Sequence, residues 1–257
     1  MKLNGKNYFS REANLEFMSV SQFKAFDKCE ASALAELKGE WKRETTPAML
    51  VGSLVDSYFE GTFDAFIDEH PEVLRKDGML KADYQKAEKI VQRIADDPEF
   101  MSMLSGDKQV IMTGEIDGVP VKIKMDSYFS GQKIVDLKVM KDFEPIWKEG
   151  QKMPWFAAWG YDLQGAVYQE IVFQNTGKRL PFYLAAATKE KETDIQGIHI
   201  PQEYLDERLG YFKGMVRRFQ DIKDGLTEPE KCGKCDYCKA TKKFEIVDAS
   251  DIYYDME

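Results

Sequence analysis

Apolar residues recur at helical spacing in the first part of the chain. The segment Ser19-Val20-Ser21-Gln22 has the form of a capping box, which marks the start of a helix. The apolar residues that follow it at helical spacing are Phe23, Phe26, Ala33, Leu34 and Leu37. The same kind of pattern predicts a second helix from about Pro47 and a third over residues 81–96.

Beyond these helices, the pattern changes to the alternation that is typical of β-strands. We predict strands over residues 109–116, 119–129 and 133–140. Asp117-Gly118 is a strong hairpin signal between the first two strands, and Ser130-Gly131-Gln132 supplies the second turn. The three segments therefore predict an antiparallel three-strand meander.

The remaining sequence predicts helices and a strand in alternation. A helix is predicted near residues 155–175, a strand near 181–188 and a long helix from Pro201 to about Asp224. Proline suits the first helical position, and Gly225 suits the end of the long helix. This order of elements predicts an α/β fold in which a mixed β-sheet is flanked by helices.

The composition is that of an ordinary globular protein. Of the 257 residues, 43% are hydrophobic and 32% are charged, which is enough to bury a core. No apolar run reaches the roughly 18 residues that a membrane span needs, and the N-terminal residues lack the apolar stretch of a signal peptide. We therefore expect a cytoplasmic protein without a membrane partner.

The net charge of −9 lowers the expectation of non-specific DNA coating, because phosphate contacts favour Lys and Arg. It does not exclude catalysis on DNA, since a local groove can differ from the whole chain. Five lysines crowd the predicted meander: Lys122, Lys124, Lys133, Lys138 and Lys141. The two histidines, His70 and His199, stand in no recognisable catalytic context. Carboxylate chemistry is thus favoured over a histidine-based site.

Acidic residues on the meander have the chemistry of a cation site. Asp136 and Lys138 are two residues apart, so on a strand both side chains lie on one face. Asp126 lies on the neighbouring strand, and Glu115 lies one hairpin earlier. Carboxylates hold hard divalent cations, and an ammonium group offsets phosphate charge. The alternative is a solvated polar face, but the combination of an acid, nine residues and Asp-x-Lys favours a catalytic site.

The segment KMDSYFSGQKIVDLKV resembles the core motif of the PD-(D/E)XK nucleases, with Asp126 as the first acid and Asp136-x-Lys138 as the second half. Met125 stands where the proline of the motif name would be. The resemblance implies a restriction-endonuclease-like core, here as one domain over residues 1–257. Helices of about residues 19–104 and a cysteine segment of about residues 226–257 would pack on that core.

Two further segments resemble the RecB-like and lambda-exonuclease-like branch. Gln164 and Tyr168 match its Q-x-x-x-Y helix motif and share one helix face. Gly52-Ser53-Leu54-Val55-Asp56 resembles its G-x-x-x-H segment, with Asp56 in place of the histidine that helps to bind metal. An aspartate can ligate Mg²⁺ or Mn²⁺ through oxygen. On the helical pattern, a surface Asp56 remains an alternative.

The resemblance implies a divalent-cation-dependent exonuclease related to RecE that hydrolyses DNA from duplex ends in phage-type recombination. Asp126, Asp136, Glu115 and Asp56 would bind the cation, Mg²⁺ or Mn²⁺, together with the Leu137 carbonyl, and Lys138 would act on the water and the phosphate. Gln164 and Tyr168 would position the DNA or the site. The implied partners are duplex DNA ends, a single-strand annealing protein and further copies of the chain. The alternatives are a restriction-type endonuclease and a non-catalytic nucleic-acid-binding protein with a cysteine-bound metal.

The cysteines form a second candidate metal site. Cys232, Cys235 and Cys238 have the spacing C-x2-C-x2-C, which lets three thiolates converge on one metal centre. Cys29 is the remaining cysteine of the chain and the candidate fourth ligand. Disulfides are improbable in a cytoplasmic protein. Resemblance to RecB-like nucleases with an iron–sulfur staple implies a [4Fe–4S] cluster first, with a four-thiolate zinc site second and an empty site third.

Overall fold

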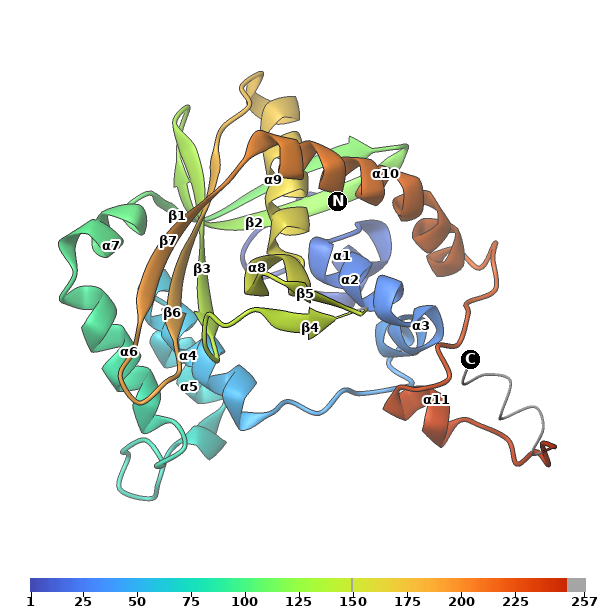
Figure 1. The fold of residues 1–257 in the computed structure, drawn as a ribbon, viewed down its shortest axis with the longest axis horizontal. Coiled ribbons are helices and arrows are strands. Elements are labelled where there is room, and N and C mark those ends of the chain that lie inside the picture. Colours follow the sequence, from blue (N-terminus) through green and yellow to red (C-terminus); the bar gives the residue numbers. More distant parts are fainter. Residues whose placement is uncertain (149, 249–257) are drawn as a thin grey trace.

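The computed structural model describes residues 1–148 and 150–248, and it has a mixed β-sheet with helices on both faces (Figure 1). The sheet has the strand order β1-β2-β3-β6-β7, in which β3 and β6 are parallel and the other neighbours are antiparallel. The strands are β1 Asp107–Ile116, β2 Val119–Phe129, β3 Lys133–Met140, β6 Phe182–Thr188 and β7 Ile195–Ile200. The α/β fold class and the predicted meander are confirmed.

Strand β7 lies outside the sequence prediction. Its residues alternate only weakly, because Gly197 and exposed polar positions interrupt the apolar ones. It pairs with β6 over its whole length and forms an edge of the sheet. Edge strands expose one side to water, so they carry a weaker hydrophobic signal than central strands.

Two hydrophobic clusters lie on opposite faces of the sheet. Alternate β3 residues point to each side: Ile134 packs in the cluster beneath α9 and α10, whereas Val135 and Leu137 pack beneath α4 and α6. In Figure 1, α9 and α10 lie on one side of the sheet and α4 to α7 on the other. These helices are α4 Pro47–Glu60, α5 Phe63–Glu69, α6 Gln85–Ala95, α7 Pro98–Met103, α9 Tyr161–Thr176 and α10 Gln202–Lys223.

The first predicted helix is in fact two, α2 Val20–Lys28 and α3 Glu30–Lys38, so the expectation of one continuous helix is wrong. Cys29 separates them with an extended backbone (φ −167°, ψ 106°). The C-terminal segment holds this break open, since the Glu230 carbonyl accepts the backbone N–H of Ala31 at 3.0 Å. A contact across some 200 residues of sequence therefore ends the helix, and periodicity gave no sign of it.

The remaining elements are short. The predicted helix near residues 155–175 is divided into α8 and α9 at Gly160, which has a left-handed backbone (φ +65°). The other short elements are α1 Arg11–Glu16, a 3-10 turn Pro71–Val73, β4 Ile146–Lys148, β5 Gln151–Met153, α8 Trp155–Ala158 and α11 Asp236–Ala240. The end of the predicted cysteine segment, residues 249–257, lies outside the described residues. Among the described helices, none is both long enough and apolar enough to span a bilayer.

Candidate active site

The sheet ladder is interrupted on both sides of Asp126. Toward β3, pairing ends at Ser127 and Val135, so the next residues in register, Asp126 and Asp136, are not paired. Toward β1, Gln109 lies opposite Asp126 but has a left-handed backbone (φ +53°) and makes no ladder pair. Non-glycine residues in this conformation are uncommon and often occur at functional sites. Strands β2 and β3 therefore diverge at the two predicted acids.

The Asp126 carboxylate bridges the diverging strands. Its Oδ2 accepts the backbone N–H of Leu137 at 3.0 Å, in place of the β2 backbone. Because the N–H and C=O of one strand residue point to the same side, the Leu137 carbonyl also faces β2. The Asp126 carboxyl group is close enough to that of Asp136 for its charge to raise the pKa of Asp136. Two carboxylates and one carbonyl thus converge at this point.

Lys138 lies beside the acids with its ammonium group on Asp136 Oδ2. The same ammonium stands over the Tyr161 ring, 4.9 Å from the centroid. Burial alone would lower the pKa of Lys138, but the charges of Asp136 and Asp126 raise it above the ordinary value. The lysine is therefore a fixed positive charge at the site.

Helix α9 holds both diverging strands through the two residues of its predicted motif. Gln164 Nε2 donates to Asp136 Oδ1 at 2.6 Å, and Tyr168 Oη donates to the Lys124 carbonyl of β2 at 2.9 Å. Both side chains are buried. Of the two roles expected for them, positioning the DNA or positioning the site, their contacts are those of the second.

Asp56 lines the same small cavity as Asp126 and Leu137, together with Glu60 of α4. Its Oδ1 is buried, and no described residue donates a hydrogen bond to it. A buried carboxylate oxygen without a donor is costly unless a cation occupies the space beside it. The structure thus brings Asp56 to the two central acids rather than to the surface.

Burial and nearby acidic groups raise the pKa values of Asp136, Asp56 and Glu60. The pKa of Asp136 is raised to about 7, first by burial and then by Asp126, against the opposing charge of Lys138. Burial, followed by Asp126, raises the pKa of Asp56 well above its ordinary value. Burial raises the pKa of Glu60 as well. An environment that disfavours several adjacent carboxylates favours a bound cation.

Glu115 is the predicted site residue that the structure does not bring to this cavity. It pairs with Pro120, six positions from Asp126 on β2, which is about 20 Å along a strand. Its backbone instead exchanges hydrogen bonds with the Gln174 side chain at 3.0 and 2.8 Å. The hairpin does place the two strands side by side as expected, but the register separates Glu115 from the acids.

Several residues at the site were not predicted. Glu60 lies one helical turn after Asp56, and Tyr161 lies three residues before Gln164, so helical spacing carried a signal for both. The Lys24 ammonium group of α2 also stands over the Tyr161 ring, 5.0 Å from its centroid. Burial, and next the charge of Lys138, lowers the pKa of Lys24 to about 8. The position of Lys24 follows from tertiary packing and has no local sequence signal.

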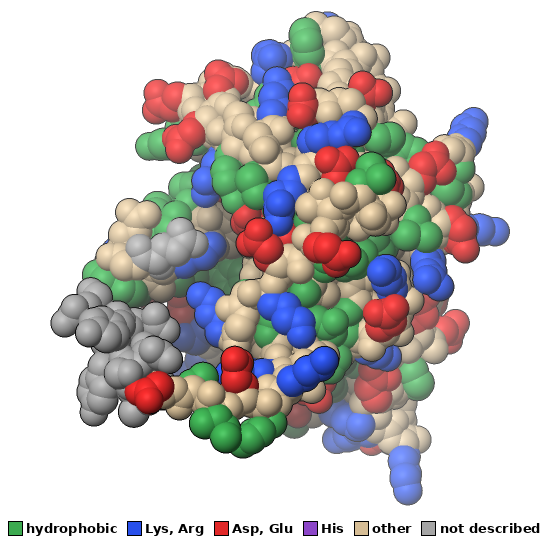
Figure 2. Space-filling view, turned by 90° about the vertical axis from the view of Figure 1, so that its right-hand side faces the viewer, with side chains coloured by type: hydrophobic (Ala, Val, Ile, Leu, Met, Phe, Trp, Pro, Cys, Tyr) green, Lys and Arg blue, Asp and Glu red, His purple; other side chains and the backbone are tan. Residues whose placement is uncertain are grey.

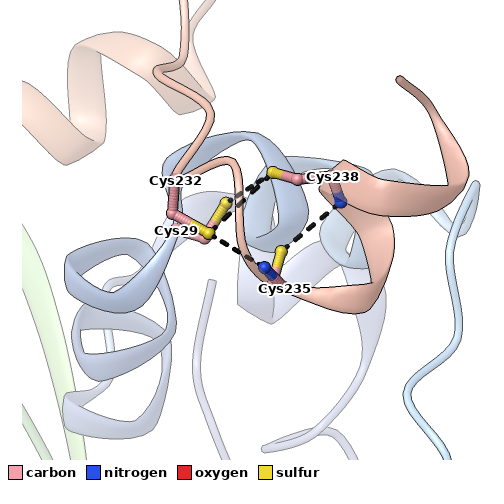
Figure 3. Close-up of side chains that lie close together, drawn as sticks. All are labelled: Cys29, Cys232, Cys235 and Cys238. Atoms are coloured by element: carbon pink, nitrogen blue, oxygen red, sulfur yellow. Dashed lines mark hydrogen bonds between the residues drawn. The ribbon is translucent and has the colours of Figure 1, made fainter. Parts of the chain in front are cut away.

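The four cysteines come together at the break between α2 and α3. Figure 3 shows the Cys29 sulfur, from the α2–α3 break, facing those of Cys232, Cys235 and Cys238. All four sulfurs lie within 4.8 Å of one another. Backbone N–H groups of Lys234 and Cys235 lower the pKa of the Cys232 thiol to about 6. Thiolates in such a group can hold a metal.

The diverging strand pair, with two acids and a lysine on a mixed sheet flanked by helices, defines the class of the protein: a nuclease of the PD-(D/E)XK superfamily. The chain belongs to the family described as a PDDEXK-like domain of unknown function (DUF3799), whose model matches residues 19–241. It is also similar to a crystal structure described as that of a putative exonuclease from Eubacterium rectale, with 46% identity, 98% of each chain covered and a TM-score of 0.93. Among curated proteins, no sequence matches.

Proposed function

We propose that this nuclease is a divalent-cation-dependent deoxyribonuclease that hydrolyses DNA from duplex ends. The observation that carries the proposal is the cavity lined by Asp56 and Asp126, close to Asp136, with the Asp56 Oδ1 atom lacking a donor among the described residues. Carboxylate and carbonyl oxygens are the ligands that Mg²⁺ and Mn²⁺ prefer. The donor set therefore fits a hard divalent cation.

Each residue has a distinct part in this proposal. Asp56, Asp126, Asp136 and the Leu137 carbonyl would hold Mg²⁺ or Mn²⁺, which supplies charge stabilisation and a more acidic bound water. The Lys138 ammonium, fixed between Asp136 and the Tyr161 ring, offsets negative charge that develops at the phosphate. Gln164 keeps Asp136 in place, and Tyr168 keeps β2 apart from β3.

The preference for duplex ends rests on likeness to other proteins. The chain carries the Gln164/Tyr168 helix of the end-processing branch, and its 46%-identical relative is described as a putative exonuclease. The expected biological setting is phage-type recombination, in which the exposed strand passes to a single-strand annealing protein. Assembly of several copies around the DNA would keep the enzyme on its substrate.

Incubation of the full chain with linear and covalently closed circular duplexes of one sequence, in Mg²⁺, tests the proposal. We expect mononucleotides or short products from the linear duplex and an intact circle. Cutting of the circle would identify an endonuclease instead. Binding without cleavage of either substrate, in both Mg²⁺ and Mn²⁺, would leave a non-catalytic nucleic-acid-binding protein.

Matched acid-to-amide variants assign the activity to this cavity. Asp126→Asn and Asp136→Asn should each abolish cleavage, because each removes a cation ligand while keeping the side-chain shape. Glu115→Gln serves as the control, since Glu115 lies far along the same hairpin and should cleave like the parent. Equal loss in Glu115→Gln would show that the register-based assignment of the ligands is wrong.

A further inference from the structure

The spacing of the four cysteine sulfurs distinguishes between the metal centres that they can hold. The Cys29 and Cys238 sulfurs are 3.6 Å apart, and the Cys232 and Cys238 sulfurs are 3.9 Å apart. No pair in the group exceeds 4.8 Å. The sulfurs thus form a compact group around one point, as Figure 3 shows.

A single tetrahedral ion requires this spacing. Four sulfurs that each lie about 2.3 Å from one Zn²⁺ ion are about 3.8 Å from one another. In a [4Fe–4S] cluster, each of the four thiolates binds a different iron, so the sulfurs surround a larger body and lie farther apart. The separations between the cysteine sulfurs match the first arrangement. They leave no room for a four-iron core between the sulfurs.

The backbone around the group also favours ionised thiols. The N–H of Cys235 points at Cys232 Sγ at 3.4 Å, and the N–H of Cys238 points at Cys235 Sγ at 3.5 Å. Gly233 has a left-handed backbone (φ +74°) that permits the tight turn between the first two thiols. Such N–H groups stabilise the negative charge of a thiolate. A cysteine must be in this deprotonated form to bind a metal.

The surrounding contacts hold the two chain segments together at the same place. Glu30, next to Cys29, accepts two hydrogen bonds from Arg218 at 2.7 and 2.9 Å and one from the backbone N–H of Glu230 at 2.8 Å. On the face of the molecule that Figure 2 shows, positively and negatively charged side chains are interspersed. That distribution lacks the single-sign character that phosphate binding favours.

We propose that Cys29, Cys232, Cys235 and Cys238 bind one Zn²⁺ ion tetrahedrally, as a structural staple in place of an iron–sulfur cluster. The four cysteine sulfurs occupy all four coordination positions of the ion. No position remains for water or substrate, as in other structural zinc sites. It fixes the α2–α3 break against the C-terminal segment. The inference is independent of the proposed exonuclease activity, since it concerns none of the carboxylates.

Metal content measured on the full chain tests the proposal. The protein is expressed with added iron and cysteine and without added zinc, purified without oxygen, and assayed for zinc, iron and acid-labile sulfide. We expect one zinc per chain, no sulfide and a colourless solution. Exchange with Co²⁺ should give the absorption of a tetrahedral thiolate site. A brown protein with iron and sulfide overturns the proposal, and so does a metal-free protein with four freely reacting thiols.

Four variants assign the zinc to the cysteines. Cys235→Ser, at a half-buried position, should lose the ion, whereas Asp136→Asn should keep it. The reverse result would show that the zinc is held by the carboxylates instead. His70→Ala and His199→Ala should also keep the ion. Since the chain has four cysteines, thiol titration before and after chelation counts the ligands directly. Zinc that remains in Cys235→Ser at one equivalent overturns the four-thiolate assignment even if the variant folds poorly, because the readout is the bound ion.

Discussion

The carboxylate cavity and the cysteine group are both built to hold cations, but they stand in opposite relations to the fold. At the cavity, burial raises the pKa values of Asp56 and Asp136, and the charge of Asp126 adds to this effect against the opposing charge of Lys138, so the chain pays in stability for bringing these acids together. At the cysteine group, Glu30 and Arg218 add hydrogen bonds around the thiols, and distant segments are joined. The carboxylate cavity is therefore a region of unfavourable electrostatics, and the cysteine group is a region that restrains the chain.

This difference predicts opposite responses to substitution. Neutralising a ligand in a region of unfavourable electrostatics relieves the folded protein while it removes chemistry. Weakening a region that restrains the chain lowers stability and leaves the chemistry unchanged. The two regions also differ in which cation they suit, because the first offers oxygen and the second sulfur.

Apart from the substitutions of the two central acids, the largest effect is expected from Lys138→Ala. Its ammonium is held on Asp136 and over the Tyr161 ring, where it can offset charge that grows at the phosphate. Loss of such a positioned charge costs on the order of a hundred-fold in rate. Single-turnover cleavage of an end-labelled duplex should show this loss. A DNA-binding titration in Ca²⁺ should show little change, because one lysine supplies a small share of the phosphate contacts.

Lys141→Ala is the matched control for that lysine. It lies just beyond the same strand, and its side chain is 94% exposed. It should cleave at the parental rate. Cleavage by Lys138→Ala within a few-fold of the parent would mean that this lysine is one of the solvated charges of the strand and has no part in the reaction.

Asp56→Asn should change activity and stability in opposite directions. Losing an outer partner of a metal ligand already costs about tenfold to a hundredfold, so losing a ligand should cost at least as much cleavage. In metal-free protein at pH 8, the variant should be more stable by roughly 1–2 kcal/mol, as when a strained functional group is relieved. Urea unfolding measures this, with exposed Asp68→Asn of α5 as the control. A fall in stability would place Asp56 outside the region of unfavourable electrostatics.

The stability gain of Asp56→Asn should depend on pH with a definite sign. Because the pKa of Asp56 is raised by folding, the folded state binds more protons than the unfolded state above the ordinary value of 3.8. The free energy of unfolding of the metal-free parent therefore falls as the pH rises from there toward the folded pKa. Below that window the variant has no advantage over the parent. An advantage that shrinks as the pH rises would contradict the raised pKa.

The meander and its two central acids could be predicted from local sequence alone. Tight turns at Asp117-Gly118 and Gly131 fix the strand ends, and strand alternation then fixes the faces of Asp136 and Lys138. Fold class and superfamily follow from those few residues. Their prediction needed no knowledge of contacts between distant segments.

The rest of the site depends on such contacts. The hairpin predicts that the strand of Glu115 lies beside that of Asp126, but the register places Glu115 opposite Pro120, far along the strand from the acids. The left-handed backbone of Gln109 and the approach of Lys24 arise only when β1 and α2 pack against the core. The break at Cys29 depends on Glu230, far along the chain. Tertiary packing here overrides local propensity.

A smaller effect is expected from Glu30→Gln, beside the cysteine group. The substitution removes the charge that accepts two bonds from Arg218, whose side chain is 35% exposed. Allowing for this exposure, we expect a loss of about 1–2 kcal/mol in the free energy of unfolding and unchanged cleavage. Glu230→Gln is the control, because it contacts the same arginine from a side chain that is 81% exposed. A slowed reaction in Glu30→Gln would show that the two regions are coupled.

The smallest effect is expected from removing the hydroxyl of Tyr168. Tyr168→Phe leaves the Lys124 carbonyl without its donor, where β2 has already lost the β3 ladder. An unsatisfied buried carbonyl costs about 1–2 kcal/mol, and the freed strand can shift toward β3 and narrow the cation cavity. Tyr161→Phe, on the same helix, loses only a hydroxyl that lies 3.6 Å from the Met140 sulfur, so its stability should change less. Urea unfolding of both variants, with and without Mg²⁺, measures the pair. We expect Mg²⁺ to restore part of the stability loss in Tyr168→Phe, since a cation between Asp126 and Asp136 would hold the strands apart. Equal stability losses in both variants would show that the Tyr168 hydroxyl does not set the strand separation.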